Sequence, residues 1–454
     1  MFQQFIDRTD ELRILENRYE SNRPEFVIIY GRRRVGKTEL VLNFIKNKPN
    51  VYFLAEERQD AENLREMQEM MGEFIGDDEF KLIRFDNWVD LFKGFLKRAE
   101  KRSVIIIDEF PYLIKKNPAI PSEFQKIWDL YLSKSNMVLI LIGSSISMME
   151  GLLGRKSPLY GRRTGQLEIK PIGIFDVKEF LPKYSIEDHI NVYSCVDGIP
   201  LYLKQFSDKL PFYGNIKRVF LNRDALLYSE AEILLKQEFR EPANYFSILR
   251  ALSFGYTRHN EIVDYTSLDK TIISKYIQNL ERIKIIRREY PVTERKEKRK
   301  NARYTFTDNY FRFWFRFIYP NKTLIEKGEA GQVIRAIKQD YGSYLGHIFE
   351  DVGREFLWKV VPFQFTKIGR WWHKDKEIDL VGISEQAREI GFFEVKWKSL
   401  SKRESLRILT ELKERSTLVD WARKKEYFGL IAKNIESKDE LREQGYLAYD
   451  LGDF

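Results

Sequence analysis

Residues 26–38 read FVIIYGRRRVGKT, and this stretch decides the fold of the first part of the chain. Five apolar or aromatic residues predict a short buried strand, and a loop with two glycines follows them. The next segment, ELVLNFIKN, has the apolar spacing of a helix. The loop matches the pattern G-x-x-x-x-G-K-[ST] in its required strand–loop–helix context. The alternative, a basic turn before a helix, does not explain why all three parts occur together.

The residue types of this loop suit a nucleoside triphosphate. Gly31 and Gly36 let the backbone curl so that its N–H groups and the start of the helix face an anion. We expect Lys37 to reach the β and γ phosphates and the Thr38 hydroxyl to bind Mg²⁺. The sequence therefore predicts an ATP site made of Gly31, Arg32, Arg33, Arg34, Val35, Gly36, Lys37 and Thr38.

A second apolar run ends in two acidic residues. Residues 103–113, SVIIIDEFPYL, predict a strand that ends at Asp108 and Glu109. Asp108 is placed to bind Mg²⁺ through water, and Glu109 to polarise the water that attacks the γ phosphate. An apolar run ending in Asp-Glu is common by itself, but beside the phosphate loop it predicts the metal-binding acid and the catalytic base of an ATPase.

A third strand, expected at residues 137–145, ends in Ser144 and Ser145. These hydroxyls either contact the γ phosphate or the attacking water, or cap the next helix, and the sequence does not decide between these roles. Further on, Arg162 and Arg163 follow a glycine and precede a strand. They either stabilise charge in the transition state, within one subunit or in a neighbour of a homo-oligomer, or form a solvated basic turn.

The order of these patterns divides the chain into three parts. Strands alternate with helices over residues 1–170, which predicts an α/β fold with a parallel, helix-covered sheet. Helical patterns over residues 171–235 predict a lid on the nucleotide side. We therefore expect a P-loop ATPase domain with a helical lid at 1–235, a winged-helix domain at 236–308 and an α/β domain at 309–454.

Composition indicates a globular protein of the cell interior. The chain has 454 residues, of which 43% are hydrophobic and 14% aromatic, enough for two to four cores. No run of apolar residues is long enough to span a membrane. The lone Cys195 excludes an internal disulfide framework and fits a reducing compartment, so we expect a cytoplasmic location. The net charge of +9 permits a polyanionic partner but does not require one.

The middle of the chain has the pattern of a winged helix, in which three helices precede two strands joined by a loop. We expect the buried side of the third helix to comprise Ile272, Ile273, Tyr276, Ile277 and Leu280, and its outer side Lys270, Ser274, Lys275 and Gln278. The loop concentrates basic side chains at Arg295, Lys296, Lys298, Arg299, Lys300 and Arg303. This clustering favours DNA, with the third helix in the major groove and the loop on phosphates. Winged helices also dock proteins, and charge runs are usually solvated.

The last part begins with an unusually aromatic stretch, NYFRFWFRFIYP, at residues 309–320. Stacking on bases is one role for such residues. The helical spacing of Phe311, Trp314, Phe315 and Ile318 instead favours an apolar plug between two domains.

A second cluster of charged residues lies near the end of the chain. In GFFEVKWKS, residues 391–399, Glu394 and Lys396 point to the same face of a predicted strand. Asp379 interrupts the preceding apolar strand at a distance that an antiparallel hairpin would close. Glu350 lies on an amphipathic helix that comes before both strands.

Two carboxylates on neighbouring strands repel each other unless a cation lies between them. Oxygen ligands of this kind suit Mg²⁺ or Mn²⁺, so we expect Asp379 and Glu394 to hold a metal, and Glu350 on the preceding helix is predicted as a third ligand. Lys396 would position a metal-bound water and neutralise charge at a phosphorus under attack. A plain Glu–Lys salt bridge explains the sequence EVK but not the aspartate in the neighbouring apolar strand.

The order of the motifs FIDRTDELRILENRYE, GRRRVGKTEL, IIIDEFPYL, LIGSS and PLYGRRTGQLEIKP resembles that of the archaeal-type P-loop ATPases, a branch of the AAA+/STAND assemblage. The resemblance implies ATP at Gly31–Thr38 and a sensor or finger role for Arg162 or Arg163. The last part resembles a domain of unknown function that is similar to the PD-(D/E)XK nucleases. It implies that Glu350, Asp379, Glu394 and Lys396 occupy the motif positions.

Two departures from these patterns stand out. No proline precedes Asp379, and Ser144 stands where AAA+ sensors carry asparagine. The sequence is compatible with three functions. The first is an ATP-dependent enzyme that cleaves DNA, and the second is a regulatory ATPase switch whose last domain binds nucleic acid or protein without cutting it. The third is a transcription regulator.

Overall fold

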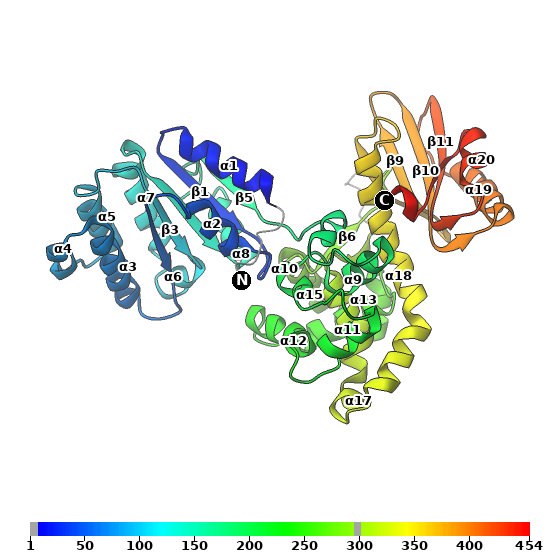
Figure 1. The fold of residues 1–454 in the computed structure, drawn as a ribbon, viewed down its shortest axis with the longest axis horizontal. Helices are drawn as coiled ribbons and strands as arrows, with labels where there is room; N and C mark the ends of the chain where they lie inside the picture. The colour runs from blue at the N-terminus through cyan, green and yellow to red at the C-terminus, as the bar shows by residue number, and fades with distance from the viewer. Residues whose placement is uncertain (1–7, 295–300) are drawn as a thin grey trace. The chain divides into compact units, whose positions relative to one another are not determined.

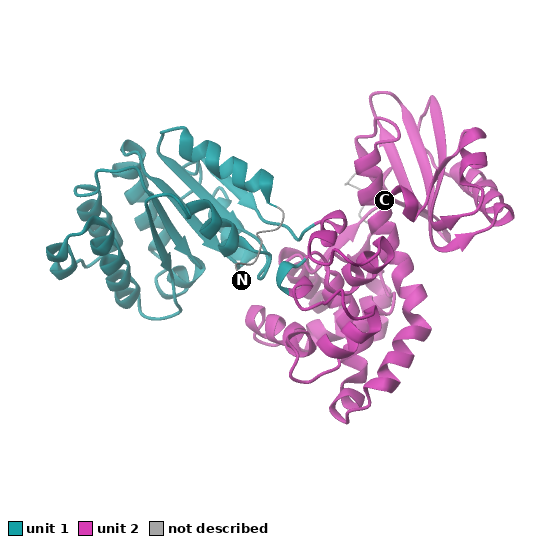
Figure 2. Ribbon diagram, in the orientation of Figure 1, with its two compact units in different colours: residues 1–172, 199–201 teal, residues 173–198, 202–454 magenta. Residues whose placement is uncertain are grey.

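The computed structural model describes residues 8–294 and 301–454. The chain forms two compact units, drawn in different colours in Figure 2. Unit 1 comprises residues up to Ile172 together with Ile199–Leu201, and unit 2 comprises Gly173–Gly198 and Tyr202–Phe454. The segment predicted to be a lid therefore belongs largely to unit 2, and the three-domain division stays a prediction. No helix in the described ranges is both long and apolar enough to cross a membrane.

Unit 1 is built on a parallel five-stranded sheet, as predicted (Figure 1). Its strands, in their order across the sheet, are β2 (Asn50–Leu54), β3 (Val104–Asp108), β4 (Val138–Gly143), β1 (Glu25–Tyr30) and β5 (Gly165–Glu168). Every residue of β1, β3 and β4 is buried, which explains why these segments read as continuous apolar runs rather than alternating ones.

Helices cover both faces of this sheet, because each face is apolar. One face packs against α3 (Asp60–Ile75), α5 (Trp88–Leu96), α6 (Pro111–Lys116), α7 (Ile120–Leu130) and α8 (Ile146–Leu153). The other face packs against α1 (Thr9–Glu20) and α2 (Lys37–Ile45). A short helix, α4 (Asp78–Leu82), follows α3. The two cores hold the carboxyl ends of β1, β3 and β4 side by side, where the predicted site residues lie.

Unit 2 begins with helices and continues into the predicted winged helix. Its first helices are α9 (Ile186–Val196), α11 (Phe212–Val219) and α12 (Leu226–Glu238), and α10 (Pro200–Leu203) lies at the division between the units. The winged-helix segment comprises α13 (Ala243–Ser253), α14 (His259–Thr266), α15 (Lys270–Arg282), and the antiparallel strands β6 (Ile286–Glu289) and β7 (Arg303–Phe306).

The exposed face of α15 is wider than its sequence suggested. Ile273, Ile277 and Leu280 are buried, as expected, but Ile272 is 44% exposed, so its predicted place in the core was wrong. A single stripe with steps of four and three residues contacts the rest of the winged helix, and Ile272 lies one helical position outside it. Lys270, Ser274, Lys275 and Gln278 are exposed, as predicted.

The aromatic stretch forms α16 (Asn309–Phe313) and a π-helical turn (Trp314–Ile318), and all four of its predicted plug residues are buried. After α17 (Lys322–Glu326), the 31-residue α18 (Ala330–Val360) leads into the second five-stranded sheet (Figure 1). The order of this sheet is β12 (Leu447–Tyr449), β11 (Lys425–Ile435), β10 (Glu389–Leu400), β9 (Lys376–Ser384) and β8 (Lys367–His373), with helices α19 (Lys402–Ser416) and α20 (Lys438–Glu443).

The winged helix and this sheet are joined within unit 2. Past the end of β6, the backbone N–H of Val292 donates to the carbonyl oxygen of Arg370 on the edge strand β8 at 2.9 Å. The Val292 side chain belongs to the apolar core of the sheet, with Trp371 and Ile378. The wing strands therefore pack against the edge of the C-terminal sheet.

Candidate functional site

The first candidate site lies at the carboxyl ends of β1, β3 and β4. Gly31 has φ +155° and Gly36 has φ +91°, so the backbone between them turns in conformations that favour glycine. A Cβ atom at Gly31 would lie 2.3 Å from the carbonyl oxygen of Ile169, so no larger residue fits there. The loop then enters α2 at Lys37, with the helix N-terminus facing the space that the loop encloses.

Lys37 folds back onto its own loop. Its Nζ donates to the carbonyl oxygens of Gly31 and Arg32 at 3.0 and 2.9 Å. Burial lowers the pKa of Lys37 to about 8, although nearby Glu109 and Asp108 act to raise it. A buried ammonium that donates to backbone carbonyl oxygens is placed to exchange them for phosphate oxygens.

Asp108 accepts hydrogen bonds from three directions. Thr38 Oγ1 and Tyr52 Oη donate to its Oδ2 at 2.6 and 2.8 Å, and the backbone N–H of Glu109 donates to its Oδ1 at 2.8 Å. Burial and the charge of Asp108 raise the pKa of Tyr52, so the phenol stays a donor. Thr38 and Asp108 thus lie together, as an Mg²⁺ site requires.

Glu109 is held next to Ser144. The Ser144 hydroxyl donates to Glu109 Oε2 at 2.9 Å, and the Ser144 backbone N–H lies 3.4 Å from the same oxygen. Glu109 has φ +53°, a left-handed conformation that is unusual for this residue type and is found at functional sites. Ser145, the alternative candidate, occupies the N-cap of α8 without a side-chain capping bond.

Further contacts hold the remaining residues of the loop, and most of them come from residues outside it. The guanidinium of Arg8 donates to the carbonyl oxygens of Val35 and Lys170 at 3.2 and 2.6 Å. Arg33 Nη2 donates to the Tyr112 hydroxyl at 3.4 Å. Arg32 offers its carbonyl oxygen to Lys37, and Arg34 has φ +70°.

Arg162 and Arg163 are engaged away from the loop. Arg162 Nε lies 3.0 Å from both carboxylate oxygens of Asp129, and its Nη1 donates to the carbonyl oxygen of Pro158 at 3.0 Å. Arg163 donates to Gln166 Oε1 at 2.8 Å. Their predicted roles with ATP stay predictions, because a phosphate contact requires each to leave these partners.

The donor set of this site fits Mg²⁺ and a nucleotide triphosphate. Thr38 Oγ1 and the Asp108 carboxylate would supply oxygen ligands to the metal, and Lys37 and the loop amides would supply donors for phosphate oxygens. Glu109 lies beyond Asp108, where a base for the attacking water belongs.

The second candidate site lies where β9 meets β10. Leu380 pairs with Phe393 in an antiparallel register, which brings Asp379 beside Glu394 as expected. Lys396 Nζ lies 2.8 Å from Asp379 Oδ2 and 2.6 Å from Glu394 Oε2. The backbone N–H of Val395 also donates to Asp379 Oδ2 at 2.8 Å. One ammonium therefore bridges the two carboxylates.

The surroundings of this cluster shift the pKa values of Glu394 and Lys396. Glu394 is 1% exposed, and burial, followed by the charge of Asp379, raises the pKa of Glu394 against the opposing effect of Lys396. Burial disfavours the ammonium of Lys396, but Asp379 and Glu394 outweigh burial and raise the pKa of Lys396 above its ordinary value. Arg415 Nη1 lies 3.1 Å from Glu394 Oε1 and donates to the carbonyl oxygen of Glu377 at 2.9 Å.

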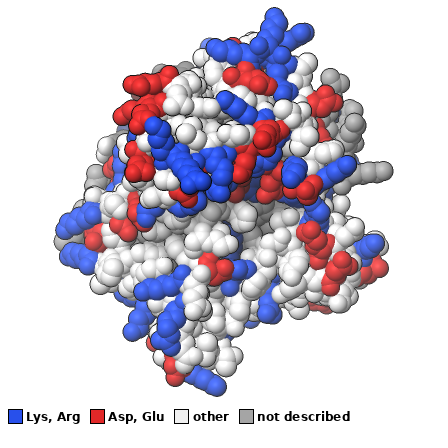
Figure 3. Space-filling model, turned by 90° about the vertical axis from the view of Figure 1, so that its right-hand side faces the viewer, with Lys and Arg blue, Asp and Glu red and all other residues white. Residues whose placement is uncertain are grey.

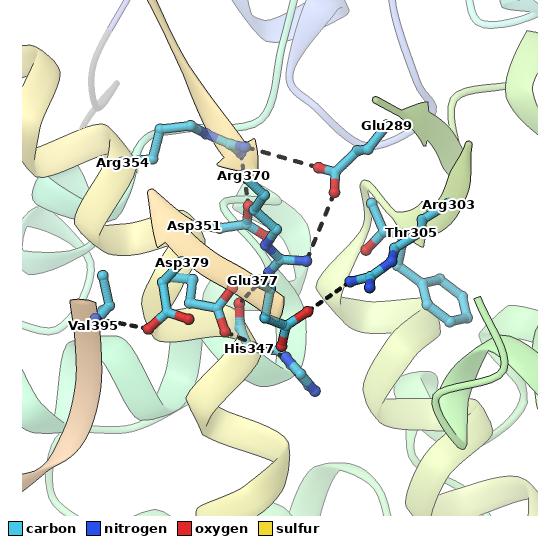
Figure 4. A network of polar contacts seen from close by, with 12 residues as sticks. Glu289, Arg303, Thr305, His347, Asp351, Arg354, Arg370, Glu377, Asp379 and Val395 are labelled. Carbon is cyan, nitrogen blue, oxygen red and sulfur yellow. Dashed lines mark hydrogen bonds and ion pairs between the residues drawn. The ribbon is translucent and has the colours of Figure 1, made fainter. Parts of the chain in front are cut away.

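Glu350 takes part in a network of ion pairs with Arg370 and Glu289, and Figure 4 shows the last two of these residues. Arg370 Nη2 lies 2.7 Å from Glu350 Oε2, and its Nη1 lies 3.7 Å from Glu289 Oε2 of β6. Burial raises the pKa of Glu350, although Arg370 opposes this shift. The pKa of the neighbouring Asp351 is lowered instead. Several arginines, of which Arg354 has the largest effect, outweigh the burial of this carboxyl group.

A close ligand set for a metal is not found here. Across residues 8–294 and 301–454, no three His, Cys, Asp or Glu side chains are arranged to hold a metal ion. Lysine and arginine groups occupy the places beside Glu350, Asp379 and Glu394. The carboxylate oxygens still suit Mg²⁺ or Mn²⁺ by their chemistry, and the metal site stays a prediction.

The predicted nucleic-acid surface is described only in part. The loop residues Arg295, Lys296, Lys298, Arg299 and Lys300 lie outside the described residues. Arg303, at the start of β7, pairs with Glu377 at 2.8 Å and lies over the Trp372 ring. Figure 3 shows basic and acidic side chains interspersed on the visible face rather than a surface of one sign. Charge alone therefore does not identify the partner.

Several contacts were missed in the sequence analysis. Tyr52, Arg8, Arg370 and Arg415 all contact predicted site residues or their loop. Tyr52 lies on the strand beside Asp108, and the side-by-side position of β2 and β3 follows from the strand order, which no local pattern reveals. Arg415 approaches Glu394 from α19.

Two parts of the chain match known protein families. Residues 5–206 match an ATPase domain found predominantly in archaea, and residues 314–408 match a family of archaeal and bacterial proteins of unknown function. The uncharacterized protein MJECL04 of Methanocaldococcus jannaschii is 41% identical over 456 residues, which cover 99% of this chain and 100% of its own. The uncharacterized ATP-binding protein MJ0423 of the same organism is 48% identical over 44 residues, 10% of this chain and 75% of its own.

A solved structure supports the fold. The Walker-type ATPase PABY2304 of Pyrococcus abyssi superposes with a TM-score of 0.51 and 22% sequence identity. The match covers 69% of this chain and 97% of that one. At this identity the likeness concerns the fold alone.

Proposed function

We propose that this chain, which belongs to the family of archaeal ATPases in which a region of unknown function follows the ATPase domain, couples ATP hydrolysis to the cleavage of nucleic acid. The protein is a P-loop ATPase. In our proposal Lys37 binds the β and γ phosphates, Thr38 and Asp108 hold Mg²⁺, and Glu109, positioned by Ser144, orients the attacking water. The buried Cys195 accords with a cytoplasmic location.

The Arg162 and Arg163 guanidiniums are proposed to complete the ATP site. Arg162 must first release Asp129, so its role requires a rearrangement or a neighbouring copy of the chain. An arginine supplied by a neighbour would make the ATPase active as a homo-oligomer.

One observation carries the proposal for the C-terminal sheet. Asp379 of β9 and Glu394 of β10 both contact the ammonium of Lys396 on β10. The two distances are 2.8 and 2.6 Å. A surface salt bridge needs only one carboxylate and no buried partner, whereas Glu394 is almost completely buried. A bound Mg²⁺ or Mn²⁺ would supply a Lewis acid for phosphodiester hydrolysis. Asp379 and Glu394 would hold the metal, and Lys396 would balance charge at the phosphorus.

The order of elements supports the same proposal. Helix α18, strands β8, β9 and β10, helix α19 and strand β11 follow one another, with β10 and β11 parallel and β9 antiparallel to β10. This α-β-β-β-α-β order accords with the resemblance to PD-(D/E)XK nucleases. Glu350 lies on the helix that precedes the sheet, and Asp379 and Glu394 lie on adjacent strands.

A regulatory ATPase that binds nucleic acid or protein without cutting it is the second candidate. The ion pairs that neutralise Glu350, Asp379 and Glu394 favour it, because a purely structural network would look the same. The exposed face of α15 serves either function, since Lys270 and Lys275 point away from the core.

The experiment that tests the proposal measures cleavage of labelled DNA by the full chain. Single-stranded, blunt duplex and branched DNA are incubated with Mg²⁺ or Mn²⁺, with and without ATP. Asp379→Asn should abolish cleavage and keep ATP hydrolysis. The matched control Asp375→Asn alters an exposed carboxylate on the turn between β8 and β9 and should keep both activities. Equal cleavage by Asp379→Asn and the parent would refute the nuclease proposal.

A further inference from the structure

Unit 2 contains a cavity of about 430 Å³ that includes part of the proposed cleavage site. Its wall is formed by Glu350 of α18 and Asp379 of β9, together with Arg312 and Arg316 of the aromatic segment. This volume lies within the range of pockets that enclose small ligands, roughly 300–1,000 Å³. The cavity therefore has the size for a nucleotide rather than for a double helix.

Arg312 is a buried cation with a spare donor. The residue is 7% exposed, and its Nη2 donates to Thr305 Oγ1 and to the carbonyl oxygen of Phe306, both at 3.2 Å. Asp351 Oδ2 lies 3.9 Å away. In the described part of the chain, Arg312 Nη1 has no hydrogen-bond partner. Buried donors are normally satisfied, so a donor on the wall of a cavity points to an acceptor-rich ligand.

Arg316 adds a second guanidinium to the wall, one helical turn from Arg312. Its Nε donates to Asp340 Oδ2 at 2.6 Å, and the group lies 4.4 Å from the centre of the Phe254 ring. Phe254 also lines the cavity and is 41% exposed. Nearby in the sequence, Tyr256 and Tyr265 are exposed, with ring centres 4.9 Å apart. Exposed aromatic rings beside basic groups are the features on which unpaired bases stack.

The wing strands close one side of the cavity. Arg303 Nη1 donates to Glu377 Oε2 at 2.8 Å, and Trp372 Nε1 donates to the carbonyl oxygen of Asn301 at 3.1 Å. Figure 4 shows Arg303 of β7 reaching Glu377, on the same strand as Asp379. These contacts tie β7 to the C-terminal sheet beside Asp379 and favour a single strand over a duplex as the occupant of the cavity.

We infer that this cavity binds the phosphorylated end of a single nucleic-acid strand. Arg312 and Arg316 bind the terminal phosphate, because guanidinium groups match the geometry of phosphate oxygens. Phe254 stacks on a base of the same strand. The inference rests on the proposed function, in which Glu350 and Asp379 act on a phosphodiester, and it names the substrate as a strand end.

The test measures equilibrium binding by fluorescence anisotropy with the full chain in EDTA, which prevents metal-dependent cleavage. The probes are single strands of about 12 nucleotides with a phosphate at the 5′ end, a phosphate at the 3′ end or hydroxyls at both ends, and a blunt duplex. We expect one phosphorylated end to bind about tenfold more tightly than the hydroxyl-ended strand and the duplex. Unlabelled mononucleotide should compete at least tenfold more weakly than the strand, because it lacks the stacked neighbours.

Variants connect this preference to the cavity. Arg316→Gln and Arg312→Gln should each remove the preference for the phosphorylated end, and Arg316→Gln keeps the test valid if the buried Arg312→Gln variant does not fold. Phe254→Ala should weaken both single strands equally, since it removes stacking but not the phosphate contact. Arg335→Gln, an exposed arginine of α18, is the matched control and should bind like the parent.

Two results would overturn the inference. An equal affinity for phosphorylated and hydroxyl ends would show that no end is bound, and equal competition by the mononucleotide would assign the cavity to a free nucleotide. Cleavage is a separate measurement: end-specific binding without any cleavage contradicts only the nuclease proposal. Cleavage without end-specific binding contradicts only this inference.

Discussion

Lys396→Met isolates the role of the ammonium between Asp379 and Glu394. The substitution keeps the length of the side chain and removes the charge that contacts both carboxylates at 2.8 and 2.6 Å. Removing one partner of a buried ion pair costs about 3–5 kcal/mol. The Lys396 side chain is 34% exposed, so solvent screens part of this cost, and we expect a loss of about 2–3 kcal/mol.

The loss should appear locally, in β9 and β10. Native-state hydrogen exchange measured by mass spectrometry reports the opening of peptides that span these strands. With about 1.36 kcal/mol for each factor of ten, protection of these peptides should fall about 30- to 150-fold. The control Lys398→Met lies two residues further along β10, where Lys398 pairs with Glu404 at the surface, and should change protection by less than about threefold.

The pH dependence of Lys396→Met follows from Glu394. Burial already holds the pKa of Glu394 above its ordinary value, and loss of Lys396 raises that pKa further. A carboxyl group whose pKa is higher in the folded state stabilises the fold below its ordinary pKa, and this stability is lost as the pH rises through the folded value. The loss of hydrogen-exchange protection in Lys396→Met should therefore be large at pH 8 and smaller at pH 5. Equal protection in Lys396→Met and Lys398→Met at pH 8 would refute the reasoning.

Three further predictions concern the ATP site and the fold. Glu109→Gln should keep ATP binding and slow its hydrolysis at least about 100-fold, because the attacking water loses its base; single-turnover kinetics with unchanged rates would show that another residue is the base. Tyr52→Phe removes one of the side-chain hydrogen bonds to Asp108 and should raise the Mg²⁺ concentration needed for half-maximal hydrolysis about tenfold, whereas an unchanged Mg²⁺ titration would contradict a positioning role. Burial raises the pKa of Glu355 to about 7 from an ordinary value of 4.5, so its stabilising contribution is present at low pH and lost as the pH rises through 7. Glu355→Gln should therefore stabilise unit 2 by up to about 3 kcal/mol at pH 8 and change little at pH 5, as measured by urea unfolding; a destabilised variant at pH 8 would contradict this assignment.

The sequence predicted best where one short segment determines its own structure. The loop from Gly31 to Thr38 is such a segment, because glycine conformations, the adjacent strand and the following helix are all local. The pairing of Asp379 with Glu394 was also predictable, since a hairpin brings together residues that are close in sequence and alternation fixes their faces.

Contacts between distant segments were not predictable. The pairing of Arg162 with Asp129 joins residues 33 positions apart, and that of Arg370 with Glu289 joins β8 to a strand of the winged helix. Each depends on how helices and strands pack in space, which no pattern within one segment encodes. The arginines of the aromatic stretch illustrate this point, because their spacing resembles a surface stripe while Arg312 is almost fully buried.

Nuclease activity of the C-terminal sheet depends on whether Asp379 and Glu394 exchange the Lys396 ammonium for a divalent cation. Isothermal titration of Mn²⁺ into the full chain, without nucleotide and in the presence of a non-cleavable phosphorothioate DNA strand, measures this directly. We predict a binding event in the parent and in Asp375→Asn that is lost in Asp379→Asn and in Glu394→Gln, while all four proteins hydrolyse ATP. An identical Mn²⁺ titration of the parent and Asp379→Asn would contradict the account and leave an ATPase switch that does not cut nucleic acid.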